Sequence, residues 1–181
     1  MNYRLLGHSG LRVSEISLGT MTFGEDWGWG ASREESRKIY DRYREAGGNF
    51  IDTANVYTNG QSELFLGEFV KGHRDEVVLA TKYTNAAPGK GPNAGGNHRK
   101  SMMEAVEASL RRLQTGYIDL YWMHIWDQIT PVEEVMRAFD DLVRQGKILY
   151  AGVVGCAGMV GRAGKHDCIA TRLVAFRRLA N

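Results

Sequence analysis

Val77-Val78-Leu79-Ala80-Thr81 is a continuous run of mostly apolar residues. A strand with one face in water alternates apolar and polar residues, whereas a continuous run indicates a strand that helices cover on both faces. Strands of that kind belong to the parallel sheets of α/β proteins. The segment therefore predicts a parallel β-strand, and we expect helices and strands to alternate on either side of it.

The flanking sequence shows this alternation. Ser32 and Glu35 form a capping box that opens a helix, with Ile39, Tyr43 and Ala46 on one face. A turn-like Gly7-His8-Ser9-Gly10 predicts a hairpin between residues 3–5 and 11–13. The predicted helices cover residues 33–46, 62–70, 103–113 and 131–145, and the predicted strands cover 16–18, 49–51, 77–81, 120–123 and 148–153.

Strict alternation leaves two architectures, a doubly wound open sheet and a (β/α)8 barrel. A doubly wound dinucleotide-binding sheet needs G-x-G-x-x-G directly after its first strand, and Leu18-Gly19-Thr20-Met21-Thr22-Phe23-Gly24 does not fit that pattern. The TIM-type barrel is therefore favoured. Eight units need roughly 250 residues. The 181 residues of this chain are thus expected to hold an incomplete barrel, about five of eight βα units, over residues 1–153, followed by a basic tail over residues 154–181.

Composition narrows the range of partners. A net charge of +2, with 24% charged residues, gives no field that indicates nucleic acid or a membrane surface. The first seven residues lack the apolar stretch of a signal peptide, and no run of about 18 apolar residues occurs. We expect a cytoplasmic protein with a small-molecule partner. Cys156 and Cys168 are most simply free thiols, and no metal site is predicted.

Four side chains with useful chemistry lie at or just beyond the ends of predicted strands. They are Asp52, Tyr57, Lys82 and His124. In parallel α/β folds the carboxyl ends of the strands share one rim, so these groups are expected to converge. An acid, a phenol, an amine and an imidazole together suit the transfer of a proton to a carbonyl oxygen while hydride reaches the carbonyl carbon.

The roles follow from the chemistry of each group. Tyrosine ordinarily has a pKa of about 10, and a neighbouring ammonium favours its phenolate, so Lys82 is expected to make Tyr57 a better acid. Asp52 is expected to supply the counter-charge for Lys82, and His124 to orient or polarise the carbonyl. Each residue alone also has an ordinary structural interpretation, as a cap, a loop aromatic, a solvated charge or a core histidine.

Three segments resemble the signature regions of the aldo-keto reductases. They are Phe50 to Tyr57, the strand end Ala80-Thr81-Lys82, and Tyr117 to His124, and Leu18 to Gly24 is similar to that family's first strand. The resemblance implies a (β/α)8 barrel that uses NADPH to reduce aldehydes and ketones. It also implies that Asp52, Tyr57, Lys82 and His124 correspond to the family's catalytic tetrad. Gly19, Thr20, Met21 and Asp52 are the expected cofactor contacts.

Trp27 and Trp29 follow the first strand in a glycine-rich loop and are candidates, with Tyr57 and His124, for the substrate pocket. Val154-Gly155 departs from the Ser with Asn or Asp that the family uses to hold the nicotinamide carboxamide. Two alternatives to a working reductase therefore stay open. One is a truncated, inactive remnant, and the other is an NADPH-binding regulatory subunit resembling potassium-channel β subunits. Homo-oligomer formation is also left open.

Overall fold

A computed structural model of the chain describes residues 1–86, 91–154 and the backbone of residues 172–174. The strands are β1 (Tyr3–Leu5), β2 (Arg12–Ser14), β3 (Leu18–Gly19), β4 (Phe50–Asp52), β5 (Val78–Tyr83), β6 (Ile118–Met123), β7 (Ile148–Val153) and β8 (Arg172–Val174). The helices are α1 (Arg33–Glu45), α2 (Gln61–Phe69), α3 (Arg99–Leu113) and α4 (Val132–Arg144), with short 3-10 turns η1 (Tyr57–Gly60) and η2 (Arg74–Glu76). The predicted alternation of strands and helices is confirmed.

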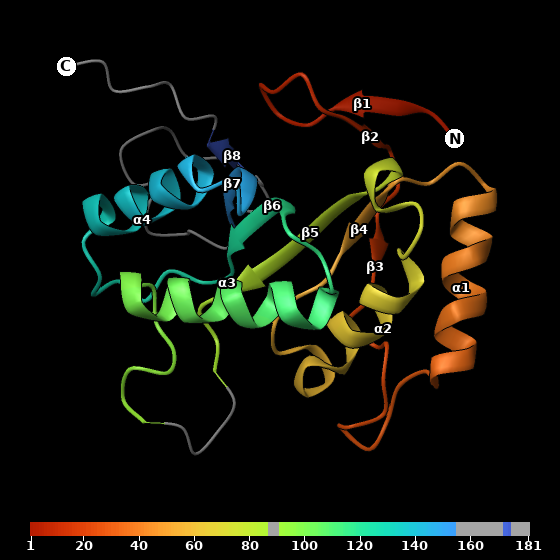
Figure 1. Ribbon diagram of the computed structural model, residues 1–181, viewed down its shortest axis with the longest axis horizontal. Coiled ribbons are helices and arrows are strands. Elements are labelled where there is room, and N and C mark those ends of the chain that lie inside the picture. The colour runs from red at the N-terminus through yellow and green to blue at the C-terminus, as the bar shows by residue number, and fades with distance from the viewer. Residues whose placement is uncertain (87–90, 155–171, 175–181) are drawn as a thin grey trace, which may run out of the picture.

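One sheet holds β3 to β8 in sequential order, and β3 to β7 pair in parallel. A doubly wound sheet reverses its strand order at a switch point and carries helices on both faces. Here the order does not reverse between β3 and β7, and Figure 1 shows α1 to α4 following the sheet on the same side. This is the arrangement of successive βα units in a TIM-type barrel, as predicted.

The two faces of the sheet differ in what covers them. Leu79, Tyr83 and Tyr121 belong to the main core cluster, which includes buried residues of all four helices. Ala80, Leu120 and Trp122 point the other way and form a second, smaller cluster. Lys82 follows Ala80 by two residues in the same strand, so it lies on the same face as the smaller cluster.

The apolar face of α1 differs from the prediction. Ile39 is 45% exposed, whereas Tyr40 is 1% exposed. The Tyr40 hydroxyl lies 2.6 Å from His73 Nε2, and its ring packs against Phe69. Tyr40 can be buried because its hydroxyl has a hydrogen-bond partner. The buried face of α1 therefore includes residue 40 in place of residue 39.

Two segments lie outside the parallel strands. The predicted hairpin forms from β1 and β2 and lies at the upper end of Figure 1, opposite the arrowhead of β5. In the predicted tail, residues 172–174 form β8, which pairs with β7 in the antiparallel sense and was not predicted. Cys156 and Cys168 lie outside the described residues. Among the described helices, none is long and apolar enough to cross a bilayer.

Candidate active site

The four candidate residues come from three neighbouring strands and one turn. Asp52 ends β4, Lys82 is the penultimate residue of β5, and His124 follows β6 directly. Tyr57 begins η1, five residues after Asp52. Because parallel strands β4, β5 and β6 are adjacent, their carboxyl ends bring these side chains to one edge of the sheet.

Lys82 is the centre of the group. Its Nζ donates to Asp52 Oδ2 at 2.6 Å, to the Thr53 carbonyl at 2.7 Å and to the Tyr57 hydroxyl at 3.1 Å. The three N–H bonds of an ammonium therefore each have an acceptor. Burial raises the pKa of Asp52, and the adjacent Lys82 opposes that rise. Lys82 is only 5% exposed, so its end of the ion pair is shielded from solvent, whereas the Asp52 side chain is 28% exposed.

Tyr57 is held by a strained turn. Thr58 and Asn59 both have left-handed backbone angles, with φ of 46° and 56°. This region is unfavourable for a β-branched residue such as threonine. Thr58 is fully buried, and its Oγ1 donates to the Phe23 carbonyl at 2.5 Å. That bond offsets the strain and fixes the point from which the Tyr57 side chain leaves the backbone.

His124 completes the group from the far side of Tyr57. The two rings lie edge to face, with centroids 6.0 Å apart. Burial, followed by the positive charge of Lys82, lowers the pKa of His124 to about 4. The imidazole is therefore neutral near pH 7. Its Nδ1 lies 3.5 Å from Asn85 Nδ2, a distance at which the amide donates to Nδ1 in the tautomer that carries its proton on Nε2.

Buried hydroxyl groups support the strand ends beneath this site. Ser62 Oγ donates to the Thr20 carbonyl at 2.8 Å and lies 2.9 Å from the Oγ1 of Thr53. Thr20 Oγ1 in turn donates to the Asp52 carbonyl at 3.1 Å. All three hydroxyl residues are fully buried. The network joins the ends of β3 and β4 to the start of α2 and so fixes the position of Asp52.

A model of the aldo/keto reductase family matches residues 15–157. The chain belongs to the aldo/keto reductase family. It is 48% identical over 162 residues to norsolorinic acid reductase of Aspergillus flavus, covering 83% of this chain and 42% of that protein. It is 46% identical over 159 residues to the NADP(+) aryl-alcohol dehydrogenase of Phanerodontia chrysosporium, covering 80% of this chain and 41% of that protein.

A solved structure supports the same assignment. The holo form of an aldo-keto reductase from Bacillus halodurans superposes with a TM-score of 0.76 at 38% identity, covering 85% of this chain and 50% of that one. The chain therefore spans about two fifths of the length of the curated relatives named above. The TIM-barrel fold type is confirmed by this likeness.

The residues expected to contact a cofactor differ in accessibility. Gly19 is exposed at the carboxyl end of β3, and a Cβ atom built there meets nothing within 4 Å. Met21 is 47% exposed. Thr20 is fully buried, and its backbone N–H and hydroxyl both donate to the Asp52 carbonyl. Gly19 and Met21 are thus the accessible residues of this set, while Thr20 holds the strand ends together.

Asn97 and Asp127, which were not predicted as site residues, join two loops beyond the carboxyl ends of β5 and β6. Asn97 is fully buried, and its N–H donates to Asp127 Oδ2 at 2.8 Å. The Asp127 N–H donates back to Asn97 Oδ1 at 2.6 Å. Asn97 Nδ2 also donates to the Ile125 carbonyl, next to His124. The only feature of the sequence that marks Asn97 is its place in a loop, directly after Gly95 and Gly96.

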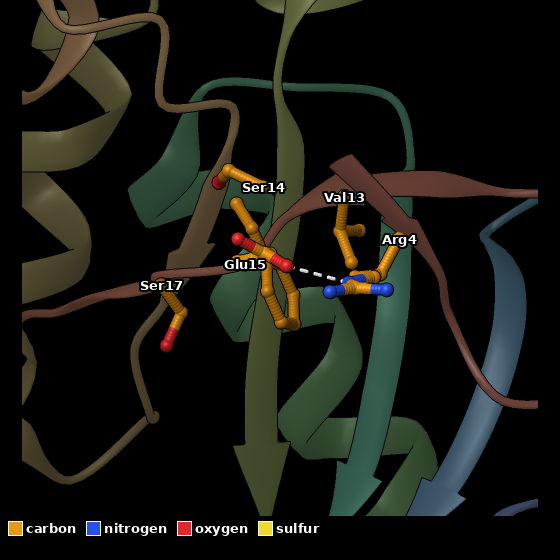
Figure 2. Close-up of a pocket in the computed structure, with 6 residues that line it drawn as sticks. Arg4, Val13, Ser14, Glu15 and Ser17 are labelled. Atoms are coloured by element: carbon orange, nitrogen blue, oxygen red, sulfur yellow. Dashed lines mark hydrogen bonds and ion pairs between the residues drawn. The ribbon is translucent and has the colours of Figure 1, made fainter. Parts of the chain in front are cut away.

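Two hollows of the described surface lie away from this site. A pocket of about 400 Å³ is lined by the hairpin and the start of β4, including Val13 and Phe50. Figure 2 shows Arg4 and Glu15 pointing toward each other there, in an ion pair of 2.5 Å. Phe50 begins β4 and Asp52 ends it, so this pocket is at the amino ends of the strands. Functional groups of TIM-type barrels gather at the carboxyl ends of the strands. We therefore take the group of Lys82, with Asp52, Tyr57 and His124, as the candidate site.

Proposed function

We propose that this chain carries the proton-transfer site of an NADPH-dependent oxidoreductase that reduces aldehydes and ketones to alcohols. The observation that carries the proposal is the position of Lys82 Nζ, which pairs with Asp52 and donates to the Tyr57 hydroxyl. Membership of the aldo/keto reductase family supports the same reaction class. Asp52, Tyr57, Lys82 and His124 are the residues to which we assign it.

The direction of the Lys82 hydrogen bond supports Tyr57 as the proton donor. Because the phenolic oxygen accepts from Nζ, the phenolic proton must point away from Lys82. A carbonyl oxygen placed on that side would accept this proton as negative charge develops on it. The ammonium then stabilises the phenolate that remains, so the proton transfer and the ion pair are coupled.

His124 has a separate role in the proposal. A neutral imidazole with its proton on Nε2 can donate a hydrogen bond to the carbonyl oxygen without competing as a strong acid. The lowered pKa of His124, about 4, supports this form at neutral pH. Tyr57 and His124 would then hold the same oxygen from two directions, as their edge-to-face rings allow. Polarisation of the carbonyl makes its carbon more electrophilic.

NADPH, when bound, supplies the hydride for the carbonyl carbon. The open space beside Gly19 and the exposed Met21 next to it leave the carboxyl end of β3 accessible to such a cofactor. The relative from Phanerodontia chrysosporium is named as NADP(+)-dependent, which supports NADPH as the expected form. Asp52 contributes by pairing with the Lys82 ammonium and holding it in place, and Thr20 contributes through its hydrogen bond to the Asp52 carbonyl.

Isotope transfer tests the proposal directly. The purified chain is incubated with an aromatic aldehyde and NADPH that carries deuterium at the transferable position of its nicotinamide. We expect the product alcohol to contain one deuterium at the carbinol carbon, measured by mass spectrometry. Cofactor binding without labelled product would favour the regulatory-subunit alternative, and the absence of both binding and a cooperative melt would favour the remnant.

A further inference from the structure

Residues 23–31, here called the tryptophan loop, form a closed unit after β3. The Gly24 N–H donates to the Ala31 carbonyl at 2.9 Å, and Phe23 and Ala31 form an isolated bridge. The loop carries Trp27 and Trp29, whose rings lie 5.6 Å apart at 43°. Trp29 is 54% exposed. Because surface loops are more mobile than the elements they connect, contacts from outside the loop help to hold the two indoles in one position.

Gln61 provides such an anchor from the first residue of α2. Its Oε1 accepts from the Glu25 N–H at 2.6 Å, and its Nε2 donates to Asp26 Oδ1 at 3.1 Å. One carboxamide therefore binds two successive residues of the tryptophan loop, immediately before Trp27. Both ends of the amide are used, so the side chain has one orientation.

The backbone of the loop is shaped to receive this side chain. Gly24 has φ of +108°, and a Cβ atom there would overlap Gln61 Oε1. Only glycine leaves room for the carboxamide at this point. Thr58 Oγ1 adds a bond to the Phe23 carbonyl, and Asn59 Nδ2 adds a long one of 3.4 Å to the Asp26 carbonyl. The tryptophan loop is thus joined to the turn over residues 57–61 that starts with Tyr57.

We propose that Gln61 is a positioning residue that determines substrate specificity. By holding the tryptophan loop on the turn of Tyr57, it keeps the two indoles as a fixed apolar wall that favours aromatic over aliphatic carbonyl substrates. Aromatic rings stack on indole faces, and a wall that is already ordered costs less entropy on binding. The inference rests on the proposed function, because it takes Tyr57 as the proton donor to the bound carbonyl.

The anchoring itself is tested without catalysis. Two indoles at 5.6 Å give an exciton couplet in the far-ultraviolet circular dichroism spectrum, and Trp27→Phe identifies that signal by removing it. We expect Gln61→Ala to reduce the couplet strongly while the melt stays cooperative. Gln145→Ala, at an exposed position after α4, is the matched control and should leave the couplet unchanged. An unchanged couplet in Gln61→Ala overturns the proposal.

Specificity is tested with naphthaldehyde and butanal as the two carbonyl compounds. Loss of the anchor should raise KM for naphthaldehyde about fivefold, the effect of about one hydrogen bond, with kcat and the KM for butanal little changed. In a Trp27→Leu and Trp29→Leu background, Gln61→Ala should have no further effect on KM. Equal shifts for both aldehydes, or a further shift without the indoles, contradict the specificity role.

The two proposals fail in different ways. If the wild-type chain reduces neither aldehyde, the proposed function fails, whereas the dissociation constant of naphthaldehyde, read from quenching of tryptophan fluorescence, still tests Gln61. We then expect the dissociation constant to rise about fivefold in Gln61→Ala and to be unaffected in Gln145→Ala. Equal affinity of the wild-type chain and Gln61→Ala for naphthaldehyde overturns the role of Gln61.

Discussion

Lys82 Nζ donates a hydrogen bond to the Tyr57 hydroxyl oxygen across 3.1 Å, although the two residues belong to different βα units. The same nitrogen pairs with Asp52 at 2.6 Å. The phenol is thereby connected to an ion pair whose lysine is buried and whose Asp52 side chain is 28% exposed. This connection distinguishes the site from a chance gathering of polar residues at a strand edge.

Replacing Lys82 with Met should remove the ammonium that stabilises the Tyr57 phenolate. We expect kcat for carbonyl reduction to fall about a hundredfold or more, as for loss of general acid assistance. Steady-state kinetics with NADPH measures this. Lys71→Met, at an exposed position after α2, is the control and should retain full activity. A Lys82→Met variant with normal kcat would show that the ammonium has no part in the reaction.

The lowered pKa of His124 predicts how stability depends on pH. An unfolded histidine titrates near pH 6.5, and the folded side chain does so near pH 4. Between these values the unfolded chain binds a proton that the folded chain does not, so the free energy of unfolding falls as pH is lowered from about 6.5 to about 4. Above about pH 6.5 this contribution is constant.

Melting curves across that window test the assignment. The melting temperature of the wild-type chain should drop as the pH falls, and His124→Gln should reduce the drop because glutamine does not titrate. His8→Gln, in an exposed turn, should leave the wild-type profile intact. If His124→Gln and the wild-type chain show the same pH profile, the His124 side chain is not buried as a neutral group.

Asn97 should contribute strongly to stability although it is a loop residue. Asn97→Ala would leave the Thr84 hydroxyl, the Ile125 carbonyl and the Asp127 N–H without the partner they have now. We expect a loss of about 2 kcal/mol in the free energy of unfolding, measured with urea. Asn93→Ala, at an exposed position in the same loop, should cost less than about 0.5 kcal/mol. Equal losses of stability in Asn97→Ala and Asn93→Ala would contradict the buried hydrogen-bond network of Asn97.

The buried carboxylate of Glu63 leads to a further prediction about stability. It accepts from Arg112 Nε at 2.7 Å and from Thr81 Oγ1 at 2.6 Å, and it is fully buried. Arg112→Met leaves this charge without its counter-ion, which should cost about 3–5 kcal/mol. Urea unfolding of Arg112→Met and of the exposed neighbour variant Arg111→Met gives the comparison. A Glu63→Gln change in the Arg112→Met background should recover part of the loss.

Local patterns made the parallel strands predictable. The apolar run Val77 to Thr81 needs no distant information to indicate a strand covered on both faces, and β5 indeed covers Val78–Tyr83 with every residue buried. The capping box of Ser32 and Glu35 is likewise local, and it forms at the start of α1. Because strand ends share one edge, the meeting of Asp52, Lys82 and Tyr57 could be predicted as well.

Long-range pairings could not be read from the sequence. Tyr40 is buried in place of Ile39 because His73, in another unit, accepts or donates at its hydroxyl. Asn97 meets Asp127 across 30 residues of chain, and Gln61 meets Glu25 across 36. No periodic pattern links such residues, since the partner of each is set by the packing of the whole sheet.

The most direct test of the account is a single-turnover measurement on Tyr57→Phe with bound NADPH. We expect the rate of hydride transfer to an aldehyde to fall by about a hundredfold to ten-thousandfold, because the proton donor is gone. The dissociation constant of NADPH, measured by fluorescence, should change by less than about twofold, since the ring is retained. A variant that binds NADPH and transfers hydride at the wild-type rate would contradict the assignment of Tyr57 as the proton donor.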